Sequence, residues 1–228
     1  MKTKTTIPSR VLIIALLTAT ISPVIWSSDA VEQFIRFNST GVNTFMRVDG
    51  TSTVHDWTVK GPSINGHLKF KVALPPDATT RELREAIIAN PQASVDVQIP
   101  VTSLKSGKKD MDKKMYEAMK IEQHPAIFYK LMSLKVPEDS TSDQQSYVVQ
   151  TVGELTVAGA TRELRMPMTL RVIDAQNIRI SGQISMKMTD FNVKPPQAMM
   201  GMIKSGDKIK VNFEWSAVRE SGQTTSDR

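Results

Sequence analysis

Apolar and polar residues alternate along most of the chain from residue 93 onward. In the segment 178–188, isoleucine and methionine dominate one parity, whereas arginine, serine, glutamine and lysine occupy the other. A period of two sends successive side chains to opposite faces of a strand, so the segment predicts a strand with one buried face. The segments 95–101, 164–172 and 208–215 repeat the pattern, and each is expected to be a half-buried strand.

Further apolar, β-rich segments raise the expected number of strands to about eight. These segments are 45–59, 68–74, 127–136 and 147–157. The connectors at 158–160 and 174–177 are too short for crossover helices, so neighbouring strands should be antiparallel and form a meander.

Three segments interrupt the period of two. Residues 79–91 begin with Thr79 and Glu82 in the spacing of a capping box and end at a proline, which predicts a short helix. Residues 110–121 place methionines four apart, as on one face of an amphipathic helix. Residues 195–203 are short and rich in methionine. All three are expected to cover a sheet edge or one end of a barrel.

About eight antiparallel strands with one apolar face each must hide that face between two sheets or inside a closed barrel. An eight-stranded barrel is wide enough either to be filled by side chains or to hold one small ligand. The chain has 13 methionines, and methionine lines surfaces that adapt to flexible apolar ligands. We therefore expect a ligand, although methionine also serves as ordinary core filler.

The 228 residues suit one domain with appendages. A basic start, an apolar run from Val11 to Leu17 and small residues up to Ala30 have the pattern of a secretory signal peptide. We predict a signal peptide over 1–30, a barrel domain over 31–218 and a disordered tail over 219–228. The protein would then be exported to the periplasm or secreted; an uncleaved anchor is the alternative.

The chain has no cysteine, which excludes disulfides and thiol catalysis. Its net charge of +6 falls to +4 without residues 1–30, with 26 basic and 22 acidic residues remaining. No dense basic stripe is interleaved with aromatic residues, so nucleic acid is not an expected partner. Lys108, Lys109, Lys113 and Lys114 form either a solvated surface or a patch that attracts an anionic lipid headgroup or membrane near the mouth of the barrel.

The three histidines do not predict an active site. His55 and Asp56 are adjacent in an extended segment and point to opposite faces, so they do not pair as base and orienting acid. His67 and His124 lie far away in sequence without a metal-ligand spacing. We expect no catalytic residue, metal or cofactor, and we interpret Ser52–Trp57 as a buried turn in which Trp57 plugs the barrel base.

Several blocks resemble the YceI-like family of bacterial polyisoprenoid-binding proteins, in the family's order. They are Asp49–Trp57, Val95–Leu104, Gln123–Tyr129, Gly153–Arg162, Asp190–Pro196 and Gly206–Val211. The resemblance implies a lipocalin-like antiparallel barrel, usually periplasmic, whose elongated lumen holds a long isoprenoid or related amphiphile without chemistry. The helix expected over 77–91 is an insertion relative to that pattern.

We expect the lumen to be lined by apolar residues of inward parity and of the covering segments. They are Trp57, Phe70, Val97, Ile99, Met115, Met119, Tyr129, Leu131, Met168, Leu170, Ile184, Met186, Met199 and Met200. The leading hypothesis is a non-catalytic carrier of a polyisoprenoid or fatty amphiphile. The second hypothesis is an interaction module with a filled barrel and no ligand. The third is a hydrolase that uses His55 or His124. The oligomeric state stays open, with a homodimer as one alternative.

Overall fold

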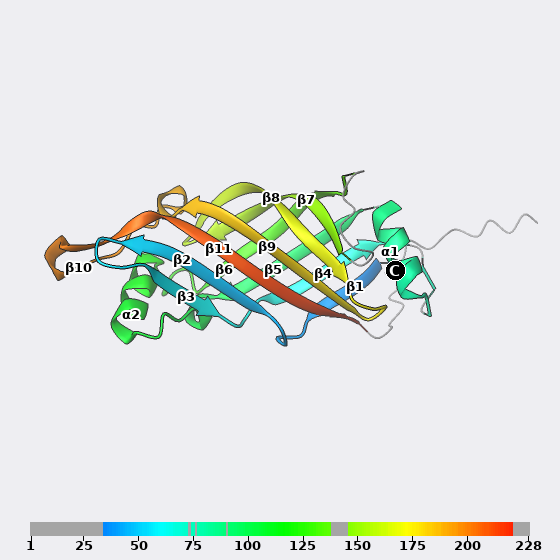
Figure 1. The fold of residues 1–228 in the computed structure, drawn as a ribbon, viewed down its shortest axis with the longest axis horizontal. Helices are drawn as coiled ribbons and strands as arrows, with labels where there is room; N and C mark the ends of the chain where they lie inside the picture. Colours follow the sequence, from blue (N-terminus) through cyan, green and yellow to red (C-terminus); the bar gives the residue numbers. More distant parts are fainter. Residues whose placement is uncertain (1–33, 73, 76, 90, 138–145, 221–228) are drawn as a thin grey trace, which may run out of the picture. The chain divides into compact units, whose positions relative to one another are not determined.

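The computed structural model describes residues 34–72, 74–75, 77–89, 91–137 and 146–220. Within them, eleven strands form one antiparallel sheet (Figure 1). The strands are β1 (Phe34–Ser39), β2 (Phe45–Ser52), β3 (Trp57–Gly61), β4 (Asn65–Lys71), β5 (Ala93–Pro100), β6 (Ala126–Lys135), β7 (Ser146–Val157), β8 (Ala160–Val172), β9 (Asn177–Lys187), β10 (Gln197–Ala198) and β11 (Ile203–Arg219).

Eight of these strands close into a barrel. Their order is β1-β4-β5-β6-β7-β8-β9-β11, and β11 pairs with β1 to complete the ring. The closing pairs include Phe37 with Arg219 and Ser39 with Ala217. This confirms the expected eight-stranded antiparallel barrel and excludes the two-sheet alternative, because a closed ring leaves no second sheet.

Strands β2 and β3 extend the wall beyond the point where β1 ends. Strand β2 pairs with β11, and β3 pairs with β2. On its other side β3 makes one bridge, in which the amides of Lys60 and Lys105 each donate to the other's carbonyl at 2.8 and 2.7 Å. The long β11 therefore pairs with β1 at one end of the barrel and with β2 at the other.

The expected short connectors are tight turns. Val157 pairs with Ala160, and the two intervening residues, Ala158 and Gly159, have φ values of 49° and 81°. Two consecutive positive φ values are typical of a type I′ hairpin turn, whose twist matches that of the flanking strands. This turn joins β7 to β8, and the four residues 173–176 join β8 to β9, whereas a helix lies in the longer connection between β5 and β6.

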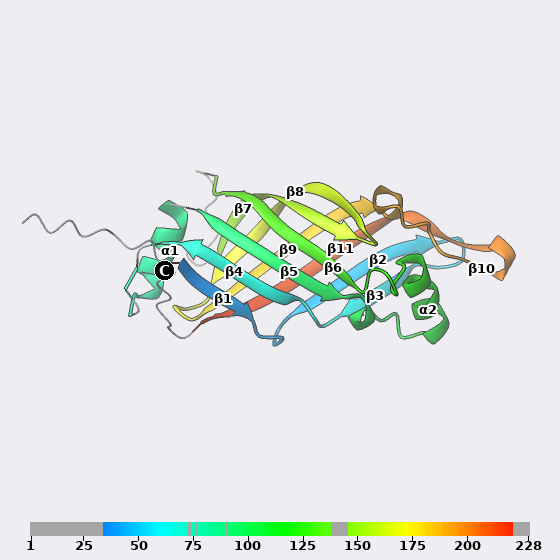
Figure 2. The ribbon, with the colours of Figure 1, turned by 180° about the vertical axis from the view of Figure 1, so that it is seen from behind.

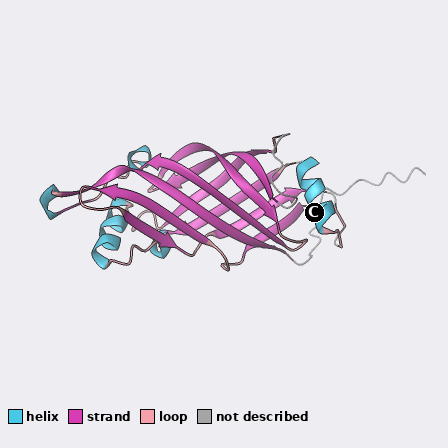
Figure 3. Cartoon of the chain, viewed as in Figure 1, coloured by secondary structure: helices cyan, strands magenta, loops and turns pink. Residues whose placement is uncertain are grey.

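The two helices lie at opposite ends of the barrel (Figures 1, 2 and 3). Helix α1 (Thr80–Ala89) has the expected capping box: the Thr79 amide donates to Glu82 at 2.8 Å, and the Glu82 amide donates to the Thr79 hydroxyl at 3.3 Å. Its Leu83 and Ile87 are fully buried. Helix α2 is Lys109–Ala118. No helix in the described part of the chain is long and apolar enough to cross a membrane.

Two parts of the chain differ from the expected elements. Residues 195–203 form no third helix; β10 pairs with β11 and is followed only by the 3-10 turn η3 (Met199–Gly201). The other short 3-10 turns are η1 (Val101–Ser103) and η2 (Met188–Phe191). Strand β1 was not anticipated, because six residues show too little alternation to stand out.

Arg219 and Glu220 do not fit the expected disordered tail. Arg219 is the last residue of β11, and its amide donates to the Gln176 carbonyl at 2.7 Å. The Glu220 amide donates to the Arg36 carbonyl at 2.8 Å. Both residues therefore belong to the barrel, while the rest of the expected tail and the expected signal peptide lie outside the described residues.

The α1 end of the barrel is packed. Phe37 and Phe70 are both fully buried, and their rings meet edge to face with centroids 6.3 Å apart, a preferred aromatic geometry. The Trp215 indole N–H donates to the Ser39 hydroxyl at 2.7 Å and ties β11 to β1. Strand β1 thus closes the ring and also fills the α1 end of the barrel with the side chain of Phe37.

Candidate functional site

An apolar cavity of about 600 Å³ occupies the barrel interior. It is lined by every strand of the closed ring except β1, and also by β2, β3 and α2. Ligand pockets in proteins are typically about 300–1,000 Å³ and mostly apolar. The barrel therefore holds internal space of the size and character of a small-molecule site, and is not filled by its own side chains.

The cavity is long. Along β11 its lining residues run from Ile203 to Trp215, which at ~3.3 Å per residue corresponds to ~40 Å of strand. Strands in closed barrels tilt by about 40° from the axis, so the cavity extends over roughly 30 Å of barrel length. Such a shape suits an extended chain better than a compact molecule.

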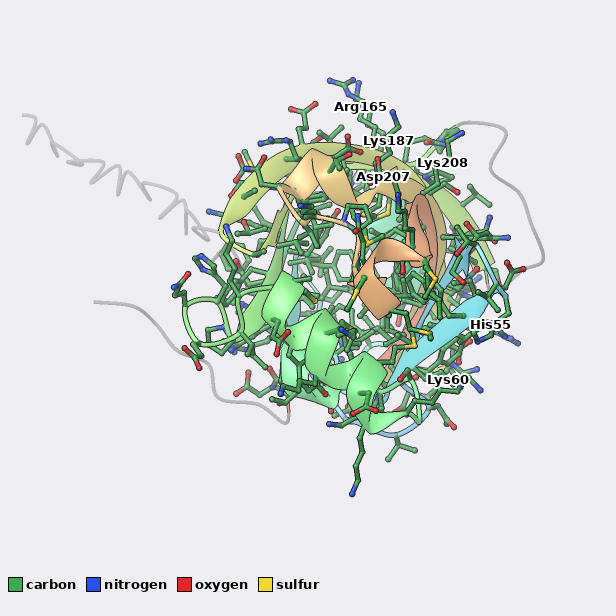
Figure 4. The ribbon with its side chains drawn as sticks, turned by 90° about the vertical axis from the view of Figure 1, so that its left-hand side faces the viewer. His55, Lys60, Arg165, Lys187, Asp207 and Lys208 are labelled. Atoms are coloured by element: carbon green, nitrogen blue, oxygen red, sulfur yellow. The ribbon has the colours of Figure 1, made fainter. Side chains whose placement is uncertain are left out.

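One end of the cavity opens to solvent. The exposed side chains of Lys108, Lys109 and Lys114 line it there, together with Asp110. The loop between β2 and β3 contributes His55, and the segment leading into β10 contributes Pro196 and Gln197. We call this end the mouth; Figure 4 looks onto it, with α2 and the β10–β11 hairpin in front.

Hydrogen bonds hold α2 at the mouth. The buried Asp112 carboxylate accepts from the amide and the hydroxyl of Ser106 at 2.7 and 2.6 Å. The Tyr116 hydroxyl donates to the Leu104 carbonyl at 2.8 Å and accepts from Lys105 Nζ at 2.7 Å. The bond to Tyr116 raises the pKa of Lys105. These contacts fix α2 against the segment from Leu104 to Ser106 and leave Lys109 and Lys114 of α2 on the cavity rim.

The loop that forms the opposite rim is a structural turn. The Ser52 hydroxyl donates to the His55 carbonyl at 2.7 Å and accepts from the His55 amide at 3.2 Å. Trp57 pairs with Gly50, and a side chain at Gly50 would overlap the indole. The indole N–H donates to the Thr51 carbonyl at 2.9 Å. His55 is exposed, and Trp57 lies at the mouth, because β3 begins there; the interpretation as a buried turn at the barrel base is therefore corrected.

A tyrosine lies deep in the apolar wall. Tyr129 lines the cavity on β6 and lies against Gly153 on β7, where any side chain would overlap the phenol. Its hydroxyl is buried and makes no hydrogen bond of good geometry within the described residues. Burial raises the pKa of Tyr129, and the neighbouring Thr151 hydroxyl offsets part of that rise. The phenol therefore stays neutral, and its O–H is enclosed by the wall against Gly153.

Twelve of the fourteen residues expected in the lumen line the cavity. They are Trp57, Phe70, Val97, Ile99, Met115, Met119, Tyr129, Leu131, Met168, Leu170, Ile184 and Met186. Met199 and Met200 do not line it: they are 63 % and 106 % exposed, because η3 turns away from the barrel at the end of the β10–β11 hairpin. Sequence reasoning missed Val211 and Phe213 on β11, although their alternation with polar residues already indicated a buried face.

The described residues include no group of three or more histidine, aspartate or glutamate side chains placed to hold a metal ion. His67 lies on β4, 3.7 Å from Asp96. His124 lies against Gly159 in the β7–β8 turn. The three histidines are thus on separate parts of the barrel, and only His55 reaches the cavity.

Two solved structures illustrate the similarity of fold. One is the crystal structure of BcnA from Burkholderia cenocepacia, with 14 % identity, 78 % of this chain and 98 % of that chain covered, and a TM-score of 0.56. The other is a polyisoprenoid binding domain from Saccharophagus degradans implicated in plant cell wall breakdown, with 10 % identity, coverage of 83 % and 99 %, and a TM-score of 0.56. No curated protein matches the chain. The model of the YceI-like domain matches residues 26–217, and the chain therefore belongs to the YceI-like family.

Proposed function

We propose that this protein binds and carries a long apolar molecule, a polyisoprenoid or fatty amphiphile, in its barrel without chemistry, in the bacterial cell envelope. The observation that carries the proposal is the long apolar cavity with one open end. The Saccharophagus degradans domain of the same fold is described as polyisoprenoid binding. The secretory pattern of residues 1–30 supports the envelope location.

Apolar burial alone can supply the affinity. Each buried CH₂ group contributes about 0.8 kcal/mol, so ten of them contribute about 8 kcal/mol before the cost of ordering the ligand is subtracted. A ligand in the channel would contact mainly leucine, isoleucine, valine, methionine and phenylalanine side chains. No charged partner is needed along most of its length.

Two features of the site support a binding role without catalysis. The cavity contains His55 at its rim, but the nearby Ser52 hydroxyl is bonded to the backbone of the same turn. Deep in the channel the polar lining side chains are Tyr129 and Thr151, and the Thr151 hydroxyl donates to the Met166 carbonyl at 2.9 Å. Neither region pairs a nucleophile with a base. The filled-barrel alternative leaves the cavity without a role.

Native mass spectrometry tests the proposal directly. The protein would be purified without detergent from a host with a cell envelope, and its mass compared before and after extraction with organic solvent. We expect a stoichiometric apolar adduct that the extraction removes, and the extract identifies its chemical class. An unliganded mass, together with no uptake of added isoprenoid or fatty amphiphile, would contradict the carrier function.

A further inference from the structure

Four exposed apolar side chains gather at the mouth end of the molecule. Met199, Met200 and Met202 are 63 %, 106 % and 70 % exposed at the end of the β10–β11 hairpin, and Val54 in the β2–β3 loop is 65 % exposed. The two segments touch: the Thr53 amide donates to the Lys204 carbonyl at 3.0 Å. We call these four residues the methionine tip; the hairpin that carries it projects beyond the barrel in Figures 1 and 2.

The backbone of the tip has an unusual conformation. Met199, Met200 and Gly201 have φ values of 49°, 53° and 87°. Residues with a side chain rarely adopt the left-handed region, and two in succession are unfavourable. The result of this conformation is that Met200 points fully into solvent. An exposed apolar cluster in a strained turn is typical of a surface that meets a partner.

The charges around the tip are complementary to an anionic surface. From Phe191 to Gly206 the chain contains Lys194 and Lys204 and no acidic residue, and both lysines are exposed. The mouth adds the three exposed lysines of the α2 region against Asp110. Apolar side chains flanked by lysines are the pattern of proteins that bind anionic lipid bilayers, since the apolar groups enter the interface while the cations meet the headgroups.

The tip is continuous with the cavity. Pro196, Gln197, Ala198 and Ile203, which form the stem of the hairpin, line the cavity wall. A flat surface that contacts the tip therefore lies over the mouth, which α2 borders on another side (Figure 4). A long apolar chain that left the cavity here would enter that surface and avoid water, whose contact with apolar groups is unfavourable.

We propose that the methionine tip docks the protein onto an anionic lipid bilayer, with its methionines in the membrane interface and the mouth facing the membrane. Docking itself does not depend on the proposed function. If the protein docks in this way, a ligand can pass directly between the bilayer and the cavity; this second step rests on the proposed carrier function.

Vesicle flotation with the form that begins at Val31 tests the docking. The barrel strands and both helices lie between Phe34 and Arg219, and omitting residues 1–30 removes an apolar segment that would bind lipid by itself. Vesicles would contain phosphatidylcholine alone or with about 30 % phosphatidylglycerol, an anionic lipid. We expect binding to the anionic vesicles that weakens with added salt, and much weaker binding to the neutral ones.

Matched variants distinguish vesicle binding by the methionine tip from nonspecific vesicle binding by the rest of the surface. Met200→Ser combined with Met202→Ser should weaken vesicle binding by at least about tenfold, because two apolar side chains no longer enter the interface. Lys204→Glu should weaken binding to anionic vesicles by about tenfold. Met132→Ser and Lys135→Glu, at exposed positions of β6 away from the tip, serve as controls and should bind as the parent does.

Three results would overturn the docking proposal. The first is absence of vesicle binding by the parent protein, and the second is equal binding by parent and tip variants. The third is a dimer in sedimentation velocity that the tip substitutions abolish, which would assign the tip to a second copy of the chain. Uptake of a fluorescent fatty acid without vesicles is measured in parallel: it should survive the tip substitutions, and its absence in the parent would count against the carrier function alone.

Discussion

The unpaired hydroxyl of Tyr129 has a measurable consequence at the scale of single residues. A buried polar group without a hydrogen bond costs about 1–3 kcal/mol, so Tyr129→Phe should leave the free energy of unfolding of the ligand-free protein unchanged or raise it by up to about 1 kcal/mol. Urea unfolding measures the change. Tyr116→Phe is the control with the opposite expectation, because the Tyr116 hydroxyl donates to the Leu104 carbonyl at 2.8 Å; a larger loss for Tyr129→Phe than for Tyr116→Phe would contradict this account.

His67 should make the stability depend on pH. Partial burial, and then the charge of Arg36, lower the pKa of His67 from its ordinary value of 6.5, and the nearby Asp96 only partly opposes them. The unfolded chain therefore binds a proton more readily than the folded one. Stability is fully present above about pH 6.5 and falls as the pH drops below that value.

The pH dependence can be isolated by substitution. Urea midpoints of the parent and of His67→Gln would be compared at several pH values between about 7.5 and 5, a range that spans the ordinary histidine pKa. The parent should lose more stability than the variant as the pH falls. Parallel curves for the two proteins would show that His67 does not titrate differently in the folded and unfolded states.

At the scale of elements, α1 depends on its capping box. Thr79→Ala removes the hydroxyl that accepts from the Glu82 amide and should lower the free energy of unfolding by about 0.5–2 kcal/mol. Thr80→Ala, one position further into the helix, is the matched control and should be nearly neutral. Denaturant unfolding compares the two, and hydrogen exchange should show faster opening of Thr80–Ala89 in Thr79→Ala. Equal effects of both substitutions would mean that the cap does not stabilise α1.

Local sequence patterns predicted some of the elements and not others. The strands β5 to β9, the capping box of α1 and α2 were predictable, because alternation, capping and helical spacing are properties of neighbouring residues. The β10–β11 hairpin was not, because a run of methionines fits a covering helix as well as an exposed turn. What separates the two is the pairing of Gln197 with Lys204 and the left-handed conformation of Met199 and Met200, neither of which leaves a periodic signal.

At the scale of the whole molecule, one large side chain placed in the cavity should prevent the ligand from binding. Ile184 on β9 lines the channel, whereas its neighbour Gln183 is exposed on the other face of the strand. Ile184→Trp should reduce the bound apolar adduct in native mass spectra by at least about tenfold, as a larger side chain takes the space of the ligand. Gln183→Trp is the matched control and should carry the adduct as the parent does.

Circular dichroism and thermal unfolding would first establish that both tryptophan variants keep the barrel. Undiminished adduct in a folded Ile184→Trp protein would place the ligand outside the channel. A loss of adduct in both variants would indicate that the substitutions disturb the barrel as a whole.

By itself, the sequence determined most of the barrel strands, though not β1 or β10, and which of their residues face inward, because a period of two is a local property of the chain. The strand alternation, together with the helical spacing of Met115 and Met119, indicated twelve of the residues that line the cavity. Only the tertiary structure decided that Phe37 and Ala217 belong to strands that close the ring, that the interior keeps about 600 Å³ of space, and that Met200 lies in solvent. These outcomes depend on pairing between distant segments and on the stagger of the whole barrel, which no short stretch of residues encodes.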